Sequence, residues 1–150
     1  MDPLTREPID LNALISNVEG PDRGAVATFL GIVRNHHDGR TVTELEYTAY
    51  EPMAAERLRS IVAEAEGLWS VRVAATHRLG LLSVGDAAVA IAVASGHRND
   101  AFVACRFVIE EIKSRLPIWK RERYDDGAEV WVDPTSSSGA YPVLTQLPHE

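Results

Sequence analysis

Two lysines lie close together in the segment EEIKSRLPIWKRE, residues 110–122. The chain has 15 basic residues, and all except Lys113 and Lys120 are arginines. An arginine guanidinium keeps its proton at physiological pH, whereas a lysine ammonium loses it readily when it is desolvated or crowded by other cations. A lysine can therefore act as a proton carrier or as a transient covalent nucleophile, and an arginine cannot.

Each lysine also has a purely structural interpretation. Lys113 stands near the C-terminal end of an expected helix, where a cation is worth about 0.3–1 kcal/mol against the helix dipole. An arginine would serve this purpose equally well. Lys120 follows Trp119 in an expected strand, and lysines are common on exposed strand edges. In the functional interpretation Lys120 instead clamps a phosphate or a carboxylate.

Two further segments carry positive charge at the ends of expected strands. SGHRND (95–100) places His97 and Arg98 between a strand and a helix start, where backbone N–H groups and a flanking arginine favour an anion. In GIVRNHH, Arg34 comes just after a buried strand. Loops at strand ends carry functional residues more often than helix faces do.

Several other chemistries lack a sequence signal. The histidines show no HxxxH, HxH or His/Cys spacing, so we expect no metal, and no bound cofactor is expected either. Cys105, the one cysteine, falls on an apolar helix stripe and is expected to be an inert buried thiol. GxSxG, P-loop and GxGxxG motifs are absent.

Composition limits the class of protein further. A chain of 150 residues with 45% hydrophobic and 25% charged residues is typical of one globular domain. The net charge of −7 argues against nucleic acid and anionic membranes as partners. No apolar run reaches a membrane span and the start MDPLTREPID lacks a signal-peptide core, so with a single cysteine we expect a reducing cytoplasm.

The hydrophobic pattern predicts an α+β domain in which helices and β-hairpins alternate. Asp38-Gly39 is a turn signal that predicts a hairpin between the strands on either side of it. Strands are expected at 24–33, 41–50, 71–80, 87–95, in IWKRERY and in VWV, with helices in IDLNALISNV, from Pro52 to Gly67 and at 99–116.

Two of these elements have clear faces. In 87–95 the valines and isoleucine alternate with alanines, a small-residue face on which a helix can pack closely. In 99–116 the expected buried stripe is Phe102, Cys105, Ile109, Ile112 and Leu116, and Pro117 ends the helix.

Five blocks of the sequence, in this order and spacing, resemble the large, catalytic subunit of molybdopterin synthase. They are GAVATFLGIVRNHHDG, LEYTAYEPMA, HRLGLLSVGD, SGHRNDAF and IKSRLPIWKRE. The resemblance runs from Gly24 to Trp131, and its most specific parts are SGHR…AF and K…P.WK.E. It implies a single domain over 1–150 with an α/β-hammerhead-like fold, antiparallel sheets and an additional small β-subdomain. The core covers about 24–133, and the tail 134–150 is expected to be flexible.

The resemblance also implies a reaction and partners. The family's large subunit is a sulfurtransferase of molybdenum cofactor biosynthesis that converts cyclic pyranopterin monophosphate to molybdopterin by forming a dithiolene. The sulfur comes from the thiocarboxylated Gly-Gly end of a small ubiquitin-like carrier subunit. The large subunit dimerises, and with two carriers it forms a heterotetramer. A buried thiol fits this chemistry, because the sulfur then has to come from outside.

Position by position, the family's motif gives these residues roles. Lys113 is the expected catalytic lysine, and Lys120 shares the catalytic role. The expected substrate-binding residues are Ile32, Val33, Arg34, His97, Arg98, Lys113, Lys120, Arg121 and Glu122. Two features depart from the pattern: Arg121 stands where a second lysine is common, and no basic residue follows Trp131.

Three alternatives stay open at this point. A non-catalytic anion- or RNA-binding module would use the same cations, although a pI near 5.2 and few aromatic residues disfavour it. A metal-dependent hydrolase would use His36, His37, His77 and His97. An inactive scaffold would bind the carrier without turnover.

Overall fold

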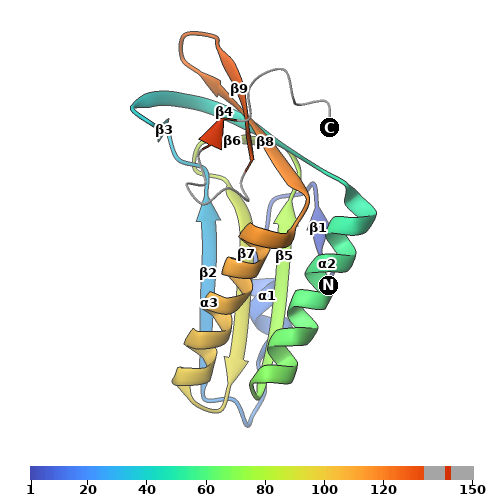
Figure 1. Cartoon of the computed structure of the whole chain (residues 1–150). Helices are drawn as coiled ribbons and strands as arrows, with labels where there is room; N and C mark the ends of the chain where they lie inside the picture. Colours follow the sequence, from blue (N-terminus) through green and yellow to red (C-terminus); the bar gives the residue numbers. More distant parts are fainter. Residues whose placement is uncertain (134–140, 143–150) are drawn as a thin grey trace.

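The structure is a computed structural model that describes residues 1–133 and 141–142 (Figure 1). Along the chain the elements are β1 (Leu4–Thr5), α1 (Leu11–Val18), β2 (Ala25–Ile32), β3 (His36–His37), β4 (Arg40–Ala49), α2 (Glu51–Leu68), β5 (Val71–Arg78), β6 (Gly80–Ser83), β7 (Ala87–Ser95), α3 (Arg98–Arg115), β8 (Ile118–Tyr124), β9 (Glu129–Asp133) and β10 (Tyr141–Pro142).

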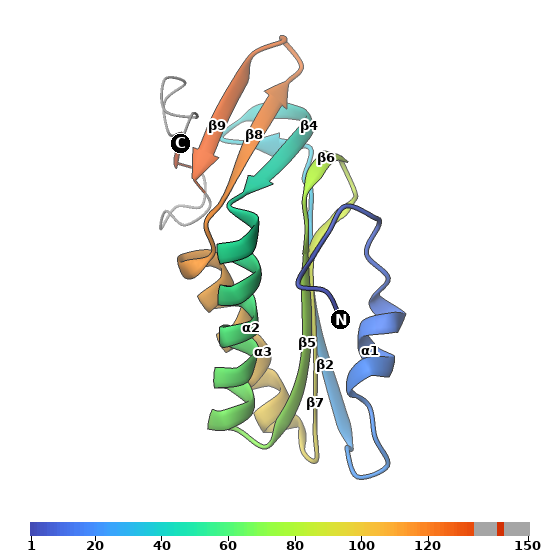
Figure 2. The same ribbon diagram turned by 90° about the vertical axis from the view of Figure 1, so that its right-hand side faces the viewer.

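A four-stranded sheet in the order β1-β5-β7-β2 forms the centre of the fold. β1 runs parallel to β5, and the other pairs are antiparallel. Helices α2 and α3 cover one face and α1 covers the other (Figure 2). A second sheet, in the order β10-β9-β8-β4-β3 with β6 paired to β4, lies beyond the end of the first. The α+β class with antiparallel sheets and an additional β-subdomain is confirmed.

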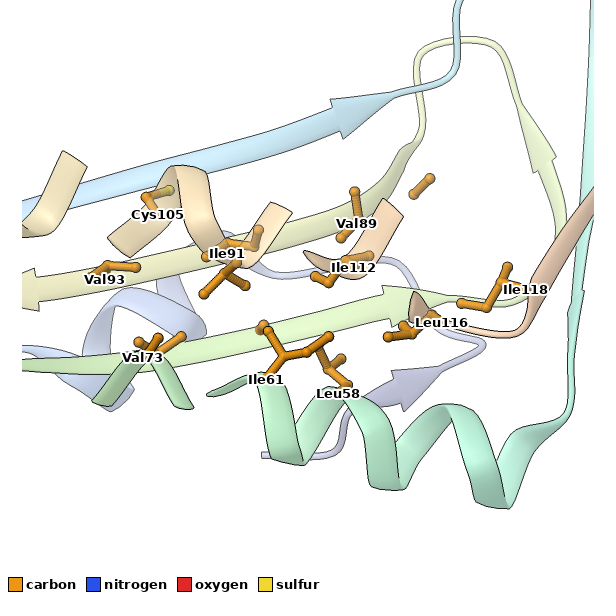
Figure 3. Packing of buried hydrophobic residues seen from close by; sticks show 14 of the residues in the cluster. Leu58, Ile61, Val73, Val89, Ile91, Val93, Cys105, Ile112, Leu116 and Ile118 are labelled. Carbon is orange, nitrogen blue, oxygen red and sulfur yellow. The ribbon is translucent and has the colours of Figure 1, made fainter. Parts of the chain in front are cut away.

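The alternating side chains of β7 explain why helices pack on both faces of the central sheet. Val89, Ile91 and Val93 point toward α2 and α3, where they join the main core (Figure 3). Ala90, Ala92 and Ala94 of the opposite face, together with Ala74, pack against Leu14 and Val18 of α1. The prediction of a small-residue face that accepts a helix is therefore confirmed.

The hairpin predicted around Asp38-Gly39 was wrong. The strands predicted at 24–33 and 41–50 do not form a hairpin: β2 pairs with β7 in the central sheet, and β4 pairs with β8 in the second sheet. The turn at Asp38-Gly39 does form, with φ of 53° and 76°, but it joins the short β3 to β4. β7 is a largely buried inner strand of the central sheet, and β2 extends that sheet by pairing with it.

Phe102 is also misplaced in the expected stripe of α3. Its side chain is 64% exposed, whereas Ala101, Ala104 and Val108 are buried with Cys105, Ile112 and Leu116. The helix turns its small residues toward β2 and β7 so that it can approach the sheet closely. Of the tail expected to be flexible, 134–140 and 143–150 lie outside the described residues, and Tyr141–Pro142 pairs with β9.

Candidate active site

Lys113 and Lys120 converge at the junction of the two sheets. Lys113 occupies the last turn of α3, and Lys120 lies in β8, directly after the break that Pro117 imposes. Arg34 arrives from the end of β2, next to the central sheet. The charges of Lys120 and Arg34 both act on the Lys113 ammonium. Arg34, which is distant in the sequence from the two lysines, is thereby brought near Lys113, and the role of these three cations in a site stays a prediction.

The surroundings of Lys113 favour its neutral form. Desolvation by the surrounding protein, followed by repulsion from Lys120 and Arg34, lowers the pKa of Lys113 below its usual 10.5. The residue nevertheless keeps access to solvent. A lysine that is reachable and can release its proton is equipped to act as a base or a nucleophile.

Two ring side chains lie near the lysines: Tyr47 is the cross-strand partner of Lys120, and His77 is close enough to Lys113 to feel its charge. His77 is buried, and burial together with the positive charge of Lys113 lowers its pKa to about 4, so its ring is neutral at physiological pH. Its ring meets that of Tyr47 edge-on, with 4.9 Å between ring centroids. Burial and the charge of Glu122 raise the pKa of Tyr47 to about 12, so this phenol also stays neutral. His77 and Tyr47 therefore add no charge next to the lysines.

Glu122 is a buried residue that contacts the ammonium group of Lys120. The carboxylate is only 3% exposed, and its Oε2 is 3.4 Å from the Lys120 Nζ. Its Oε1 receives hydrogen bonds from His37 Nδ1 at 2.6 Å and from the Tyr124 hydroxyl at 2.7 Å. Burial alone raises the pKa of Glu122, but these hydrogen bonds and Lys120 outweigh burial and lower it. Glu122 is therefore an anion that contacts a predicted site residue.

The segment before Arg34 is fixed by its backbone. Val33 is buried, its N–H donates to the Asp86 carbonyl at 2.9 Å, and its own carbonyl accepts from the Gly85 N–H at 2.9 Å. Ile32, the last residue of β2, is exposed. Both stand beside Arg34 in the chain, and their direct contact with a substrate stays a prediction.

His97 and Arg98 lie at the other end of α3 from Lys113. His97 is the N-cap residue and Arg98 is the first residue of the helix. At 1.5 Å per residue, the 15 positions from Arg98 to Lys113 span about 22 Å. Within one chain these two residues therefore do not join the cluster of Lys113, Lys120 and Arg34.

Arg121 points to the opposite face of β8 from Lys120. Its guanidinium pairs with Glu46 and, at 3.4 Å, with Glu129. Neighbouring residues of a strand point to opposite faces, so the alternation separates Arg121 from the Lys120 side chain. A role of Arg121 in substrate binding stays a prediction.

The sequence reasoning missed four side chains of this region as parts of the site. They are His37, Tyr47, His77 and Tyr124. The period of two in β8 was a usable signal for one of them, because it places Lys120, Glu122 and Tyr124 on one face. No local pattern in the sequence indicates the other three, His37, Tyr47 and His77, because they reach the site through pairings between distant segments.

Other chemistries find no support in the described part of the chain. Residues 1–133 and 141–142 contain no group of three or more His, Cys, Asp or Glu side chains arranged to hold a metal ion. Burial raises the pKa of Cys105 to about 11, so its thiol is a poor nucleophile. None of the described helices combines the length and the apolar character that a membrane crossing requires.

Comparison with known proteins gives consistent matches. The sequence profile of the family described as MoaE protein matches residues 4–115. A Bacillus subtilis protein named molybdopterin synthase catalytic subunit is 46% identical over 140 residues, which are 93% of this chain and 88% of that protein.

Two solved structures share the fold. The crystal structure of molybdopterin synthase from Staphylococcus aureus has a TM-score of 0.83 and 38% identity, and the match covers 87% of this chain and 95% of that one. A complex of subunits 1 and 2 of molybdopterin-converting factor from Helicobacter pylori has a TM-score of 0.68 at 21% identity, covering 85% and 87% of the two chains.

Proposed function

The chain belongs to the MoaE protein family, and we propose that it is the catalytic subunit of a molybdopterin synthase that transfers sulfur to cyclic pyranopterin monophosphate. The sulfur donor is the thiocarboxylated C-terminus of a small ubiquitin-like carrier subunit. In each of two transfers the carrier sulfur forms a bond to a carbon of the pterin substrate, and a carbon–oxygen bond at that carbon breaks. Water then hydrolyses the bond between the carrier acyl group and the sulfur, so that the carrier tail ends as a carboxylate.

The observation that carries this proposal is the cluster of Lys113, Lys120 and Arg34 in a protein with a net charge of −7. Both reactants are anions, one a phosphate and the other a thiocarboxylate. Bringing them together requires local positive charge, which the cluster supplies against the overall charge of the chain. The buried Cys105 supports an external sulfur source.

Lys113 has the catalytic role in this proposal. Its lowered pKa supports a neutral amine that takes up a proton or holds the intermediate covalently for a time. Lys120 and Arg34 bind the anionic groups, and Glu122 holds Lys120 from behind. The positive charges that receive the phosphate are the same charges that depress the pKa of Lys113.

The position of His97 and Arg98 supports a second copy of the chain as part of the site. A two-fold dimer in which the α3 helices of the two copies run antiparallel brings Arg98 of one copy beside Lys113 of the other. α3 packs over β2, which is the edge strand of the central sheet. α3 also exposes two apolar side chains that such a dimer would cover, Phe102 and Val103.

The assembly that follows is a heterotetramer of two such chains and two carriers. The relative from Helicobacter pylori, which was solved as a complex of subunits 1 and 2, supports a carrier partner. In that assembly the carrier tail has to reach Lys113, which is accessible to solvent.

A reconstituted reaction tests the proposed function. The purified chain is mixed with thiocarboxylated carrier and cyclic pyranopterin monophosphate, and dithiolene product is measured. We expect product with the unaltered chain and none with Lys113→Ala, while that variant still folds and binds the carrier. Full activity of Lys113→Ala would remove the lysine from the mechanism, and no product from the unaltered chain would remove the reaction itself.

A further inference from the structure

A buried chain of polar side chains runs from the β3–β4 hairpin to Lys120. His37, which is 6% exposed, contacts Glu122, and Glu122 contacts Lys120. We propose that His37 is a positioning residue, which acts through Glu122 to fix the Lys120 ammonium at the anion site. This role rests on the proposed function of Lys120 as an anion ligand.

Both hydrogen bonds to Glu122 Oε1 run from the neighbouring side chain to the carboxylate. The lowered pKa of Glu122 makes it a carboxylate, which only accepts hydrogen bonds. His37 Nδ1 at 2.6 Å and the Tyr124 hydroxyl at 2.7 Å therefore both donate to the same oxygen, Oε1. Two donors from two different strands, β3 and β8, hold that oxygen in place.

The other carboxylate oxygen of Glu122, Oε2, faces Lys120. Once Oε1 is fixed, the planar carboxylate can no longer rotate, and Oε2 stays directed at Lys120 Nζ, 3.4 Å away. Lysine has a long, flexible side chain that would otherwise sample many rotamers. The anion behind it thereby selects one ammonium position on the side of β8 that carries Glu122.

The hydrogen-bonded residues around Glu122 belong to β-strands and a tight turn. Lys120, Glu122 and Tyr124 share one face of β8, and His37 comes from β3 next to the tight turn at Asp38-Gly39. The guanidinium of Arg40 lies 3.8 Å above the centre of the Tyr124 ring and holds that donor in turn. His37, Glu122 and Tyr124 are buried, whereas Lys120 is partly exposed, which separates their positioning role from direct binding by Lys120.

A double-mutant cycle tests whether His37 acts through Lys120. His37→Leu is expected to lower the rate of dithiolene formation about tenfold, because it removes a hydrogen bond to the charged Glu122 carboxylate. In a Lys120→Ala background the same change is expected to cost less than about twofold, since the effect has lost its target. His37→Asn, whose amide keeps a donor near the Nδ1 position, is the matched control and is expected to stay within about threefold of the unaltered chain. Equal losses in both backgrounds would overturn the proposal.

A second measurement does not depend on the reaction. The chain has only two lysines, so reductive ¹³C-methylation, which keeps their charge, labels Lys113, Lys120 and the N-terminus. We expect His37→Leu to shift the Lys120 methyl resonance more than that of Lys113. Tyr124→Phe removes the other donor to Oε1 and is expected to act in the same way, which covers the case in which His37→Leu does not fold.

The activity assay and the methyl resonances distinguish failure of the positioning role from failure of the proposed function. An unchanged Lys120 resonance in His37→Leu and in Tyr124→Phe would overturn the positioning role, whatever the activity. A shifted resonance in a chain that forms no dithiolene would retain the positioning role and remove the proposed function.

Discussion

The length of α3 leads to a prediction about mixed dimers. Arg98 and Lys113 are about 22 Å apart along one helix, farther than their two side chains can bridge. If both residues serve one site, each site takes Arg98 from one chain and Lys113 from the other. A dimer that combines an Arg98→Ala chain with a Lys113→Ala chain then contains one intact site and one site that lacks both residues.

The expected activities follow from counting intact sites. Each homodimeric variant has no intact site, and removal of Lys113 alone is expected to cost about 10²–10⁴-fold, as loss of a general acid or base does. The mixed dimer, isolated through a different affinity tag on each chain, is expected to recover about half of the unaltered activity, because one of its two sites is complete.

A control with the same substitutions in another arrangement gives the opposite result. When both substitutions are on one chain and the partner chain is unaltered, each site of a shared-site dimer lacks one residue, and we expect almost no activity. If each chain used its own Arg98 and Lys113, this control would keep half of the activity and the first mixed dimer would have none. That pair of results would refute the shared site.

Three further predictions concern charge and packing. The pKa of Lys113 is lower in the folded chain than its usual 10.5, so between these two pKa values the unfolded chain holds a proton that the folded chain has released. The contribution of Lys113 to stability therefore rises with pH in this window. Below the window both states are protonated, and the contribution is unfavourable. Lys113→Met is accordingly expected to raise the free energy of unfolding at neutral pH by up to about 1 kcal/mol, as measured by urea denaturation, and unchanged stability would contradict the crowding of the cations. The rate of dithiolene formation is expected to increase with pH up to the lowered pKa of Lys113, and a flat profile would argue against a neutral amine. Gly31→Ala places a Cβ 2.7 Å from Val89 Cγ1 and is expected to cost about 1–3 kcal/mol in the same denaturation experiment, whereas no loss would show that the sheet relaxes freely there.

Most helices and strands of the chain could be predicted from the local periodicity of its apolar residues. The alternation of β7 and the position of α3 were predictable because each depends on neighbours within a few residues. The proline that ends α3 was equally local. The pairing of β2 with β7 rather than with β4 was not predictable, because it depends on which distant strand offers the larger apolar surface.

The candidate site divides in the same way. The family motif identified Lys113, Lys120 and Arg34, which the fold brings together. The separation of Arg98 from them was already implied by the length of the predicted helix, since 15 helical residues span about 22 Å. His37 was considered only as a metal ligand, because its contact with Glu122 joins segments 85 positions apart.

In the proposed reaction Lys113 has to be able to lose its proton, whereas Lys120 has to supply positive charge. The most direct test replaces each lysine by arginine and measures dithiolene formation from thiocarboxylated carrier and cyclic pyranopterin monophosphate. Arginine keeps the charge but retains its proton. We expect Lys113→Arg to lose activity about 10²–10⁴-fold and Lys120→Arg to stay within about tenfold of the unaltered chain. Near-full activity of Lys113→Arg would contradict the requirement for an ionisable amine.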